Sequence, residues 1–375
     1  RSPSRGLGDV YKRQLLTLPE RVNQQALPSI DIIDMRAELS SGNRSMFSEE
    51  LRQAIQDRLN KNEQIVLFLN RRGYASFMLC RDCGYVPQCP HCDISLTYHK
   101  TTDQLKCHYC GYQDLPPNLC PNCESPHIRQ VGTGTQRVEE ILQQEFEEAR
   151  IIRMDVDTTS RKGAHEKLLT DFENGKGDIL LGTQMIAKGL DYPNITLVGV
   201  LNADTMLNLP DFRASERTYQ LLTQVSGRAG RHEKPGKVII QTYNPTHYAI
   251  EDVQKNDYLT FYHKEMQFRK LGKYPPYYYL INFTIAHKNM KKVMEAAKHV
   301  HQILLQHLSE RALVLGPSPA AIARINNEHR FQILVKYKRE PELIHALQYL
   351  DDYYHEAYIK DKLSLKIDIN PQILM

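Results

Sequence analysis

The chain has 375 residues, and 41% of them are hydrophobic, which is enough apolar material for two or three globular units with buried cores. Charged residues make up 25% and the formal net charge is only +4, so charge alone neither requires nor excludes a nucleic-acid partner. No apolar run approaches the roughly 18 to 20 residues of a membrane span, and the first residues lack the pattern of a secretory signal. The composition therefore predicts a cytoplasmic, globular protein without a membrane partner.

The first part of the chain predicts an α/β unit. Residues 1–14 show no hydrophobic periodicity and match nothing downstream, so we interpret them as a non-native leader. Residues 15–272 alternate short apolar strands with amphipathic helices, and this order predicts a parallel sheet covered on both faces. The predicted strands are residues 30–35, 65–69, 150–156, 178–181, 195–201 and 237–242, and the predicted helices are residues 49–59, 136–146, 164–172 and 216–227.

All eight cysteines occur as four C-x2-C pairs within one short segment. Zinc prefers four tetrahedral ligands and each C-x2-C turn supplies two, so eight thiolates predict two structural zinc sites. A thioredoxin-like redox dithiol does not account for four copies, and a closed four-thiolate site leaves no position for a catalytic water. The predicted ligands are Cys80, Cys83, Cys89, Cys92, Cys107, Cys110, Cys120 and Cys123.

The cysteine segment interrupts the α/β alternation, so we interpret residues 78–128 as an insertion whose two ends, near Phe77 and Gln130, lie close together. Beyond the paired prolines at 275–276 the order changes, and residues 273–375 predict a small α+β domain of ferredoxin-like outline. Its predicted strands are residues 278–286, 312–315, 332–335 and 364–369, and its predicted helices are residues 290–308 and 342–350. The tyrosines at 274 and 277–279 suit either base stacking or packing of the linker against the core.

Two further strings suit the handling of phosphate. Residues 182–191 directly follow an apolar strand, where α/β sheets place ligands; Gly189 allows close backbone approach to a phosphate, and Asp191 can accept from a ribose hydroxyl. Residues 224–231 end a predicted helix with Arg228 and Arg231, which project toward one spot and suit a phosphate in transfer. On spacing alone, a solvated basic helix end is the alternative.

Together these strings resemble the second RecA-like lobe of superfamily 2 helicases. The T-x5-G-x-D pattern falls on Thr183, Gly189 and Asp191, and the Q-x2-G-R-x2-R pattern falls on Gln224, Gly227, Arg228 and Arg231. The cysteine insertion lies between an L-N-R-R-G string at 69–73 and the G-T-Q-M string at 182–185. With G-P-S-P-A at 316–320 and D-I-N-P at 368–371, it resembles the primosomal protein N′ (PriA) family of replication-restart helicases over residues 15–375.

The resemblance implies the C-terminal portion of an ATP-dependent 3′-5′ DNA helicase that restarts stalled replication forks and takes part in primosome assembly. It implies Arg228, Arg231 and Gln224 as catalytic residues and Gly189, Asp191 and Gly227 as nucleotide-binding residues. The implied DNA contacts are Asn70, Arg71, Arg72, Thr183, Gln184 and Lys188. ATP and Mg²⁺ are expected in an intact parent only, because the sequence contains no G-x4-G-K-[S/T] loop and no acidic magnesium box. We therefore expect this fragment alone to be inactive.

The resemblance also implies a nested zinc pairing. The first and last C-x2-C pairs form an outer site and the middle two an inner site, an arrangement that the return of the insertion to its starting point supports independently. The implied partners are DNA as forks and single strands, other primosome proteins and single-strand binding protein, with a monomeric chain. The alternative is a non-catalytic zinc-ribbon module that binds nucleic acid or a protein partner. The Gly-Arg-x2-Arg geometry separates the two interpretations, because a scaffold has no use for it.

Overall fold

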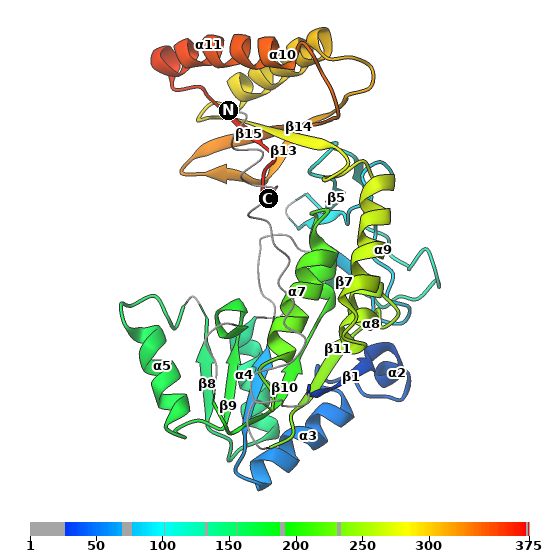
Figure 1. Cartoon of the computed structure of the whole chain (residues 1–375), viewed down its shortest axis with the longest axis vertical. Helices are drawn as coiled ribbons and strands as arrows, with labels where there is room; N and C mark the ends of the chain where they lie inside the picture. The colour runs from blue at the N-terminus through cyan, green and yellow to red at the C-terminus, as the bar shows by residue number, and fades with distance from the viewer. Residues whose placement is uncertain are drawn as a thin grey trace, which may run out of the picture.

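A six-stranded parallel sheet forms the lower half of the molecule in Figure 1, with the strand order β1-β11-β10-β2-β9-β8. The computed structural model of the chain describes residues 27–69, 77–100, 102–131, 134–155, 157–187, 192–230, 234–372 and 374. The strands are β1 (Ser29–Asp34), β2 (Gln64–Phe68), β8 (Ile151–Met154), β9 (Ile179–Gly182), β10 (Ile195–Val200) and β11 (Lys237–Thr242). Every residue of β2, β9 and β10 is buried, as strands covered on both faces require.

Helices cover both faces of this sheet, because successive side chains of each strand point to opposite sides. On one face α3 (Glu49–Asn60) and α4 (Thr135–Glu145) pack against a core that includes Leu67 and Leu181. On the other face α5 (Ala164–Glu173), α7 (Ala214–Ser226) and α8 (Tyr248–Gln254) pack against a core that includes Val66 and Leu180. All six strands and four helices predicted for the α/β unit are therefore present, with ends shifted by at most two residues.

The cysteine segment leaves and rejoins the lobe through one antiparallel pair. In this pair β3 (Phe77–Cys80) lies beside β7 (Ile128–Val131), with Phe77 opposite Val131 and Met78 opposite Gln130, which confirms that the two ends of the insertion meet. Between them lies a small sheet of β4 (Thr97–His99), β5 (Gln104–Lys106) and β6 (Gln113–Asp114). Neither small sheet joins the six-stranded sheet, so the lobe's sheet is complete without them.

The C-terminal domain is an antiparallel sheet with two helices on one face. The strand order β13-β14-β12-β15 is the ferredoxin-like order expected from the split βαβ pattern. The elements are β12 (Tyr279–His287), α10 (Met290–His307), β13 (Leu313–Ile325), β14 (Glu328–Tyr337), α11 (Leu343–Asp361) and β15 (Ser364–Ile369). Phe283 and Val335 face the helices, whereas Leu280 and Leu334 face the cysteine segment.

Some predicted ends were wrong. β13 is thirteen residues long instead of four, because it continues through Pro317 and Pro319 with two shifts of register that accommodate residues unable to donate a ladder hydrogen bond. The helix α11 continues to Asp361, past the predicted end at Leu350. Residue Met35, predicted to end the first strand, instead begins α2 (Met35–Ser40), since the side chain of Asp34 accepts from the backbone N–H of Arg36 and caps that helix.

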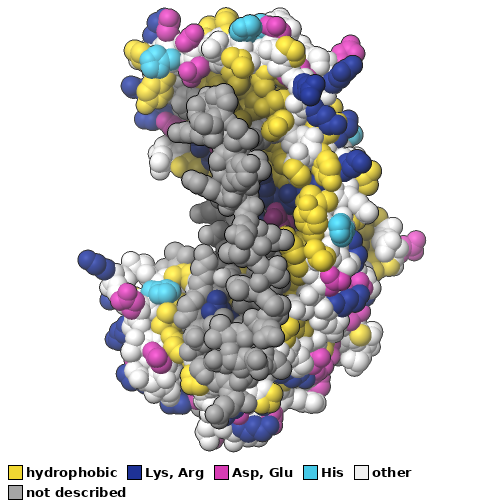
Figure 2. All heavy atoms as spheres, viewed as in Figure 1, with side chains coloured by type: hydrophobic (Ala, Val, Ile, Leu, Met, Phe, Trp, Pro, Cys, Tyr) yellow, Lys and Arg dark blue, Asp and Glu magenta, His cyan; other side chains and the backbone are white. Residues whose placement is uncertain are grey.

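The helix α9 (Tyr258–Leu271), which the sequence analysis did not predict, links the lobe to the C-terminal domain. It leaves five large apolar side chains exposed, namely Tyr258, Leu259, Tyr262, Phe268 and Leu271. In Figure 2, hydrophobic side chains gather in the region of this helix, whereas lysines, arginines and acidic side chains are interspersed over the rest of the visible described surface. Among the described residues, no helix is both long and apolar enough to cross a membrane.

Replacing a buried residue of the central strand tests the packing of the lobe. Leu67→Ala removes a fully buried side chain from β2, and we expect it to lower the free energy of unfolding by about 2 to 5 kcal/mol, because the tightly packed interior cannot close the cavity. Leu259→Ala, a matched change at a side chain that is 67% exposed, should stay within about 0.5 kcal/mol of the wild type. Chemical denaturation followed by circular dichroism measures both, and equal losses for the two variants would contradict the assigned core.

Candidate functional site

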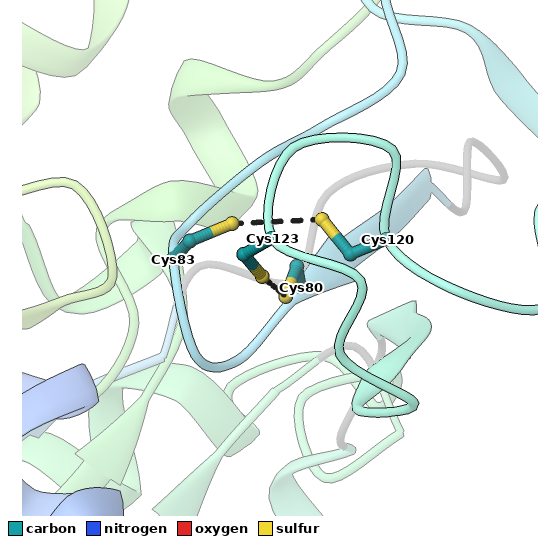
Figure 3. A group of neighbouring side chains, drawn as sticks. All are labelled: Cys80, Cys83, Cys120 and Cys123. Carbon is teal, nitrogen blue, oxygen red and sulfur yellow. Dashed lines mark hydrogen bonds between the residues drawn. The ribbon is translucent and has the colours of Figure 1, made fainter.

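Four cysteine sulfur atoms converge where the insertion leaves and rejoins the lobe (Figure 3). The ligand atoms of Cys80, Cys83, Cys120 and Cys123 all lie within 4.8 Å of one another. The sulfur of Cys80 is 3.7 Å from that of Cys123, and the sulfur of Cys83 is 3.6 Å from that of Cys120. The first and last C-x2-C pairs of the segment therefore form one cluster, which we call the outer site.

The two middle pairs form a second cluster, which we call the inner site. The sulfur atoms of Cys89, Cys92, Cys107 and Cys110 also lie within 4.8 Å of one another, and 3.5 Å separates Cys89 from Cys110. The structure thus brings together all eight predicted ligands in the nested pairing.

The same turn presents the sulfurs at each pair. The backbone N–H of the first cysteine donates to the carbonyl oxygen five residues later, as in Cys80 to Tyr85 and Cys107 to Tyr112. In all four pairs the residue after the second cysteine has a positive φ; these residues are Gly84, Asp93, Gly111 and Glu124. In two of the four turns this left-handed residue is not glycine but Asp93 or Glu124, which costs conformational energy. Such strain is expected where a bound ligand fixes the backbone.

The geometry and the charge of both clusters fit zinc. A tetrahedral site with Zn–S bonds of about 2.3 Å has sulfur–sulfur edges of about 3.8 Å, close to the separations found here. Without a cation four thiolates cannot share so small a space. Hydrogen bonding to Cys107 and Cys89, reinforced by burial, raises the pKa of Cys92, and hydrogen bonding to Cys89 raises the pKa of Cys107 to about 12. A divalent cation removes that repulsion and lets all four ligands ionise.

The two sites differ in exposure. In the inner site Cys89, Cys92 and Cys107 are buried, whereas in the outer site Cys123 is exposed and Cys83 is partly exposed. Asp82 braces the outer site from outside, since its carboxylate accepts from the hydroxyl of Ser125 and lies 3.0 Å from Nδ1 of His127. This contact links the first C-x2-C turn to the last.

Each site docks on a different part of the molecule. At the outer site, a Cβ on Gly84 would lie 2.3 Å from the carbonyl oxygen of Tyr243, just after β11, so only glycine permits this contact. At the inner site, the carbonyl oxygen of His108 accepts from Ser318 Oγ (2.7 Å) and Gln332 Nε2 (2.5 Å) of the C-terminal domain. The cysteine segment therefore lies between the lobe and the C-terminal domain.

Tyr274 belongs to the same junction. Its ring stacks on Phe212 with centroids 4.5 Å apart, and its hydroxyl donates to the carbonyl oxygen of Cys92 at 2.8 Å. Because Tyr274 is only 4% exposed, this residue follows the packing alternative and not the base-stacking one.

Thr183 lies at the carboxyl edge of the parallel sheet. It directly follows β9, whose last residue Gly182 pairs with Phe68 and Met154, the last residues of the two neighbouring strands. A short 3₁₀ helix (Gln184–Ala187) comes next. Tyr192 lies at the amino edge of the sheet. Its ring lies beside that of Phe172, and the carbonyl oxygen of Phe172 accepts a hydrogen bond from the side chain of Gln64, the first residue of β2. The T-x5-G-x-D segment thus begins at one edge of the sheet, and the chain has reached the other edge just after it ends.

The arginine string lies at the amino edge. The helix α7 connects the parallel strands β10 and β11, so it runs against them and ends where they begin. There Gln224 and Gly227 are partly exposed, as is Arg228, whose N–H donates to the carbonyl of Val225. Gly230 has φ +61°, and a Cβ on it would lie 2.3 Å from the backbone nitrogen of Gly236, so glycine is required for the chain to turn here.

Several predicted site residues lie outside the described residues, and their placement is therefore not part of this description. They are Asn70, Arg71, Arg72, Lys188, Gly189, Asp191 and Arg231. Gln184 is described in its backbone only.

The sequence analysis missed two buried carboxylates between β10 and α7. Asp204 is fully buried and accepts from the backbone N–H of Tyr243 at 2.8 Å, and burial raises the pKa of Asp204 to about 6. Asp211 is 2% exposed and pairs with Arg217 at 3.0 Å. The position of these acidic residues soon after the apolar strand β10 was the sequence feature that could have indicated them. Asp204 joins the ends of β10 and β11, which positions Tyr243 beneath the outer site.

Comparisons with known proteins agree with this arrangement. The model of the helicase conserved C-terminal domain matches residues 127–233, that of the PriA DNA helicase Cys-rich region matches residues 89–114, and that of the primosomal protein N C-terminal domain matches residues 270–372. Replication restart protein PriA of Bacillus subtilis (strain 168) is 56% identical over 362 residues, covering 96% of this chain and 45% of that protein. PriA of Synechocystis sp. is 46% identical over 364 residues, covering 96% and 43%.

A solved structure, Mss116p DEAD-box helicase domain 2 bound to an RNA duplex, is 13% identical and covers 61% of this chain and 59% of that one. Its TM-score of 0.32 is too low to add support.

The parallel lobe, with its zinc-binding cysteine insertion and its small antiparallel domain, defines a helicase C-terminal lobe of the type that carries a zinc ribbon. The chain belongs to the PriA replication restart protein family. It spans about half the length of the curated relatives that it matches.

The difference in exposure predicts the order of zinc release. We expect two zinc ions per chain by elemental analysis and two kinetic phases with a chromogenic chelator, the fast phase from the outer site because the chelator can reach Cys123 directly. Cys123→Ser should remove the fast phase and one zinc while leaving the slow phase. A single zinc in the wild type, or loss of the slow phase in Cys123→Ser, would count against the nested arrangement.

Proposed function

We propose that the chain is the C-terminal portion of an ATP-dependent DNA helicase that moves 3′ to 5′ and restarts stalled replication forks. The observation that carries the proposal is the position of two motifs at opposite edges of one parallel lobe. Thr183 lies at the carboxyl edge and Arg228 at the amino edge, so one lobe can hold DNA and nucleotide at separate places. Membership of the PriA family supports the same function.

At the amino edge, Arg228 and Arg231 would act as arginine fingers on ATP bound mainly by the other lobe of the whole protein. Always-charged guanidinium groups stabilise the negative charge that spreads over a phosphoryl group during its transfer. Gln224, one turn before Arg228, would act in catalysis with the two arginines. Gly227, directly before Arg228, would help to hold the nucleotide, together with Gly189 and Asp191. ATP and Mg²⁺ supply the phosphoryl group and its counter-charge when they are bound.

At the carboxyl edge, Thr183 would hold a DNA phosphate together with Asn70, Arg71, Arg72, Gln184 and Lys188. A threonine hydroxyl suits this role because it can donate to a phosphate oxygen without reading the base. A motor needs such sequence-independent contacts, since it must move along any DNA. The proposed substrates are forked and single-stranded DNA. The proposed partners are other primosome proteins and single-strand binding protein, and the chain is proposed to be a monomer.

A zinc-ribbon module without motor activity is the weaker proposal. It leaves unexplained why a helicase C-terminal match spans residues 127–233, which include the glycine-rich turn after α7. The zinc sites are proposed to be structural, because each closed set of four thiolates leaves no position for a reacting water.

The arginine assignment can be tested in the whole protein. Arg228→Ala or Arg231→Ala should lower DNA-stimulated ATP turnover by about 10³-fold or more, as loss of an arginine finger does, while binding to forked DNA stays near the wild-type value. Arg228→Lys should recover only part of the activity, because an ammonium retains the charge but not the planar fork. Arg150→Ala, at the start of β8, is the charge-matched control and should leave turnover unchanged. Near-normal turnover in both alanine variants would refute the assignment.

A further inference from the structure

A cavity of about 500 Å³ lies between the loop after α2 and the outer site. Its charged lining comes from three separate segments of the chain. Arg44 follows α2, and Arg81 and Asp82 lie within the first C-x2-C turn. Arg129 lies in the returning strand β7, and His127 directly precedes that strand. The fold therefore collects three arginines that are far apart in the sequence.

The cavity carries net positive charge. Asp82 is the acidic residue of its lining, and that carboxylate already accepts from Ser125 and pairs with His127. In the part of the chain that the structure describes, no carboxylate lies within ion-pair distance of Arg44, Arg81 or Arg129. The nearby Arg36 is different, because Asp34 binds it through two nitrogens at 2.8 and 2.7 Å. Three guanidinium groups thus remain to meet an outside anion.

The outer site positions Arg81 and the strand that carries Arg129. Arg81 lies between the ligands Cys80 and Cys83, and its Nε donates to the hydroxyl of Tyr243 at 3.1 Å. Its backbone N–H donates to the carbonyl of His127 at 3.1 Å, which sets its distance from the strand that carries Arg129. The contact with Tyr243 orders the Arg81 side chain before an anion binds, which lowers the conformational entropy that this side chain loses on binding.

The cavity lies at the same edge of the sheet as Thr183. Asp34 and Thr242 end β1 and β11 side by side, and the α2 loop and the first C-x2-C turn pack directly beyond them. Four strand spacings separate β9 from β1, which is about 19 Å at about 4.8 Å each. A stacked DNA strand places about five or six phosphates over that distance, at about 3.4 Å apiece.

We infer that Arg44, Arg81 and Arg129 form a phosphate-binding pocket for the DNA backbone, which extends the proposed DNA path from Thr183 across the sheet edge onto the zinc region. This inference rests on the proposed helicase function. Arginine forks match the oxygens of a phosphodiester, and the exposure of Arg44 and Arg129 leaves room for a long polymer. The contact is independent of base sequence.

The test is fluorescence anisotropy of the 375-residue chain with a labelled oligothymidine of about 20 nucleotides, over about 50 to 200 mM salt. Arg44→Ala/Arg129→Ala should weaken binding about tenfold or more at the lowest salt, and adding Arg81→Ala should weaken it further. Single strands lose about 0.7 in the slope of log affinity against log salt per phosphate contact, so the triple variant should lose about 2. Zinc content checks that each variant keeps its fold.

The control is Arg150→Ala, which removes an arginine paired with Asp178 at the opposite edge and should bind like the wild type. Wild-type affinity and slope in the triple variant would overturn the pocket while leaving the helicase proposal, tested through Arg228, in place. A wild-type chain with no salt-dependent DNA binding would overturn both the pocket and the proposed DNA path. A polyglutamate peptide that binds the wild type but not the triple variant, with DNA binding unaffected, would assign the pocket to an acidic protein partner instead.

Discussion

Repulsion between closely spaced thiolates is the constraint on which the arrangement of the chain depends. The small core of the cysteine segment, which includes Leu105 and Tyr109, is shared with the C-terminal domain, so the two sulfur clusters add the constraint that fixes the course of the segment. The outer cluster closes the segment over β11 through Gly84 and Tyr243, and the inner cluster presents the carbonyl of His108 to the C-terminal domain. Lobe and C-terminal domain thus meet across a region that zinc holds rigid. The nested pairing makes this contact possible, because it places the outer metal site against the lobe and the inner metal site against the C-terminal domain.

The length of the parallel strands separates the two motifs, because one motif begins at the carboxyl edge of the sheet and the other lies at the amino edge. A strand of four residues such as β9 spans about 13 Å, which is the order of the distance between the edge that carries Thr183 and the edge that carries Arg228. The T-x5-G-x-D segment lies in the connection between the two edges, from the end of β9 to the start of β10. Only eight residues lie between Thr183 at one edge of the sheet and Tyr192 at the other. Under the proposed helicase function, this short stretch of chain would join the DNA contact at one edge to the nucleotide contact at the other.

The sequence predicted those elements whose pattern depends on burial alone. The six parallel strands are apolar runs because helices cover both faces, and the cysteine spacing set the zinc ligands. The sequence did not predict α9, whose exposed Tyr258, Leu259 and Phe268 obscure any helical periodicity, or the full length of β13, whose prolines argued against a strand. Contacts that join distant segments were also beyond reach. The contact of Asp204 with Tyr243, that of His108 with Ser318 and the three arginines around the cavity each join segments that are far apart in the sequence, and no local pattern encodes such contacts.

The inner zinc site also accounts for a lysine that would otherwise be out of place. Lys336 in β14 is 3% exposed, donates to the carbonyl of Gly272 at 2.9 Å, and has its ammonium 3.5 Å from the centroid of the Tyr274 ring. Burial lowers the pKa of Lys336 to about 8, and the sulfur of Cys92 opposes that shift. A zinc ion with four thiolates carries two net negative charges, so the inner site supplies the counter-charge that no carboxylate among the described residues provides at ion-pair distance. Tyr274 completes the contact, since its ring faces the ammonium and its hydroxyl reaches Cys92. With zinc bound to the inner site, the lysine of the C-terminal domain and the thiolate cluster of the insertion would stabilise each other, and neither charge would be buried alone.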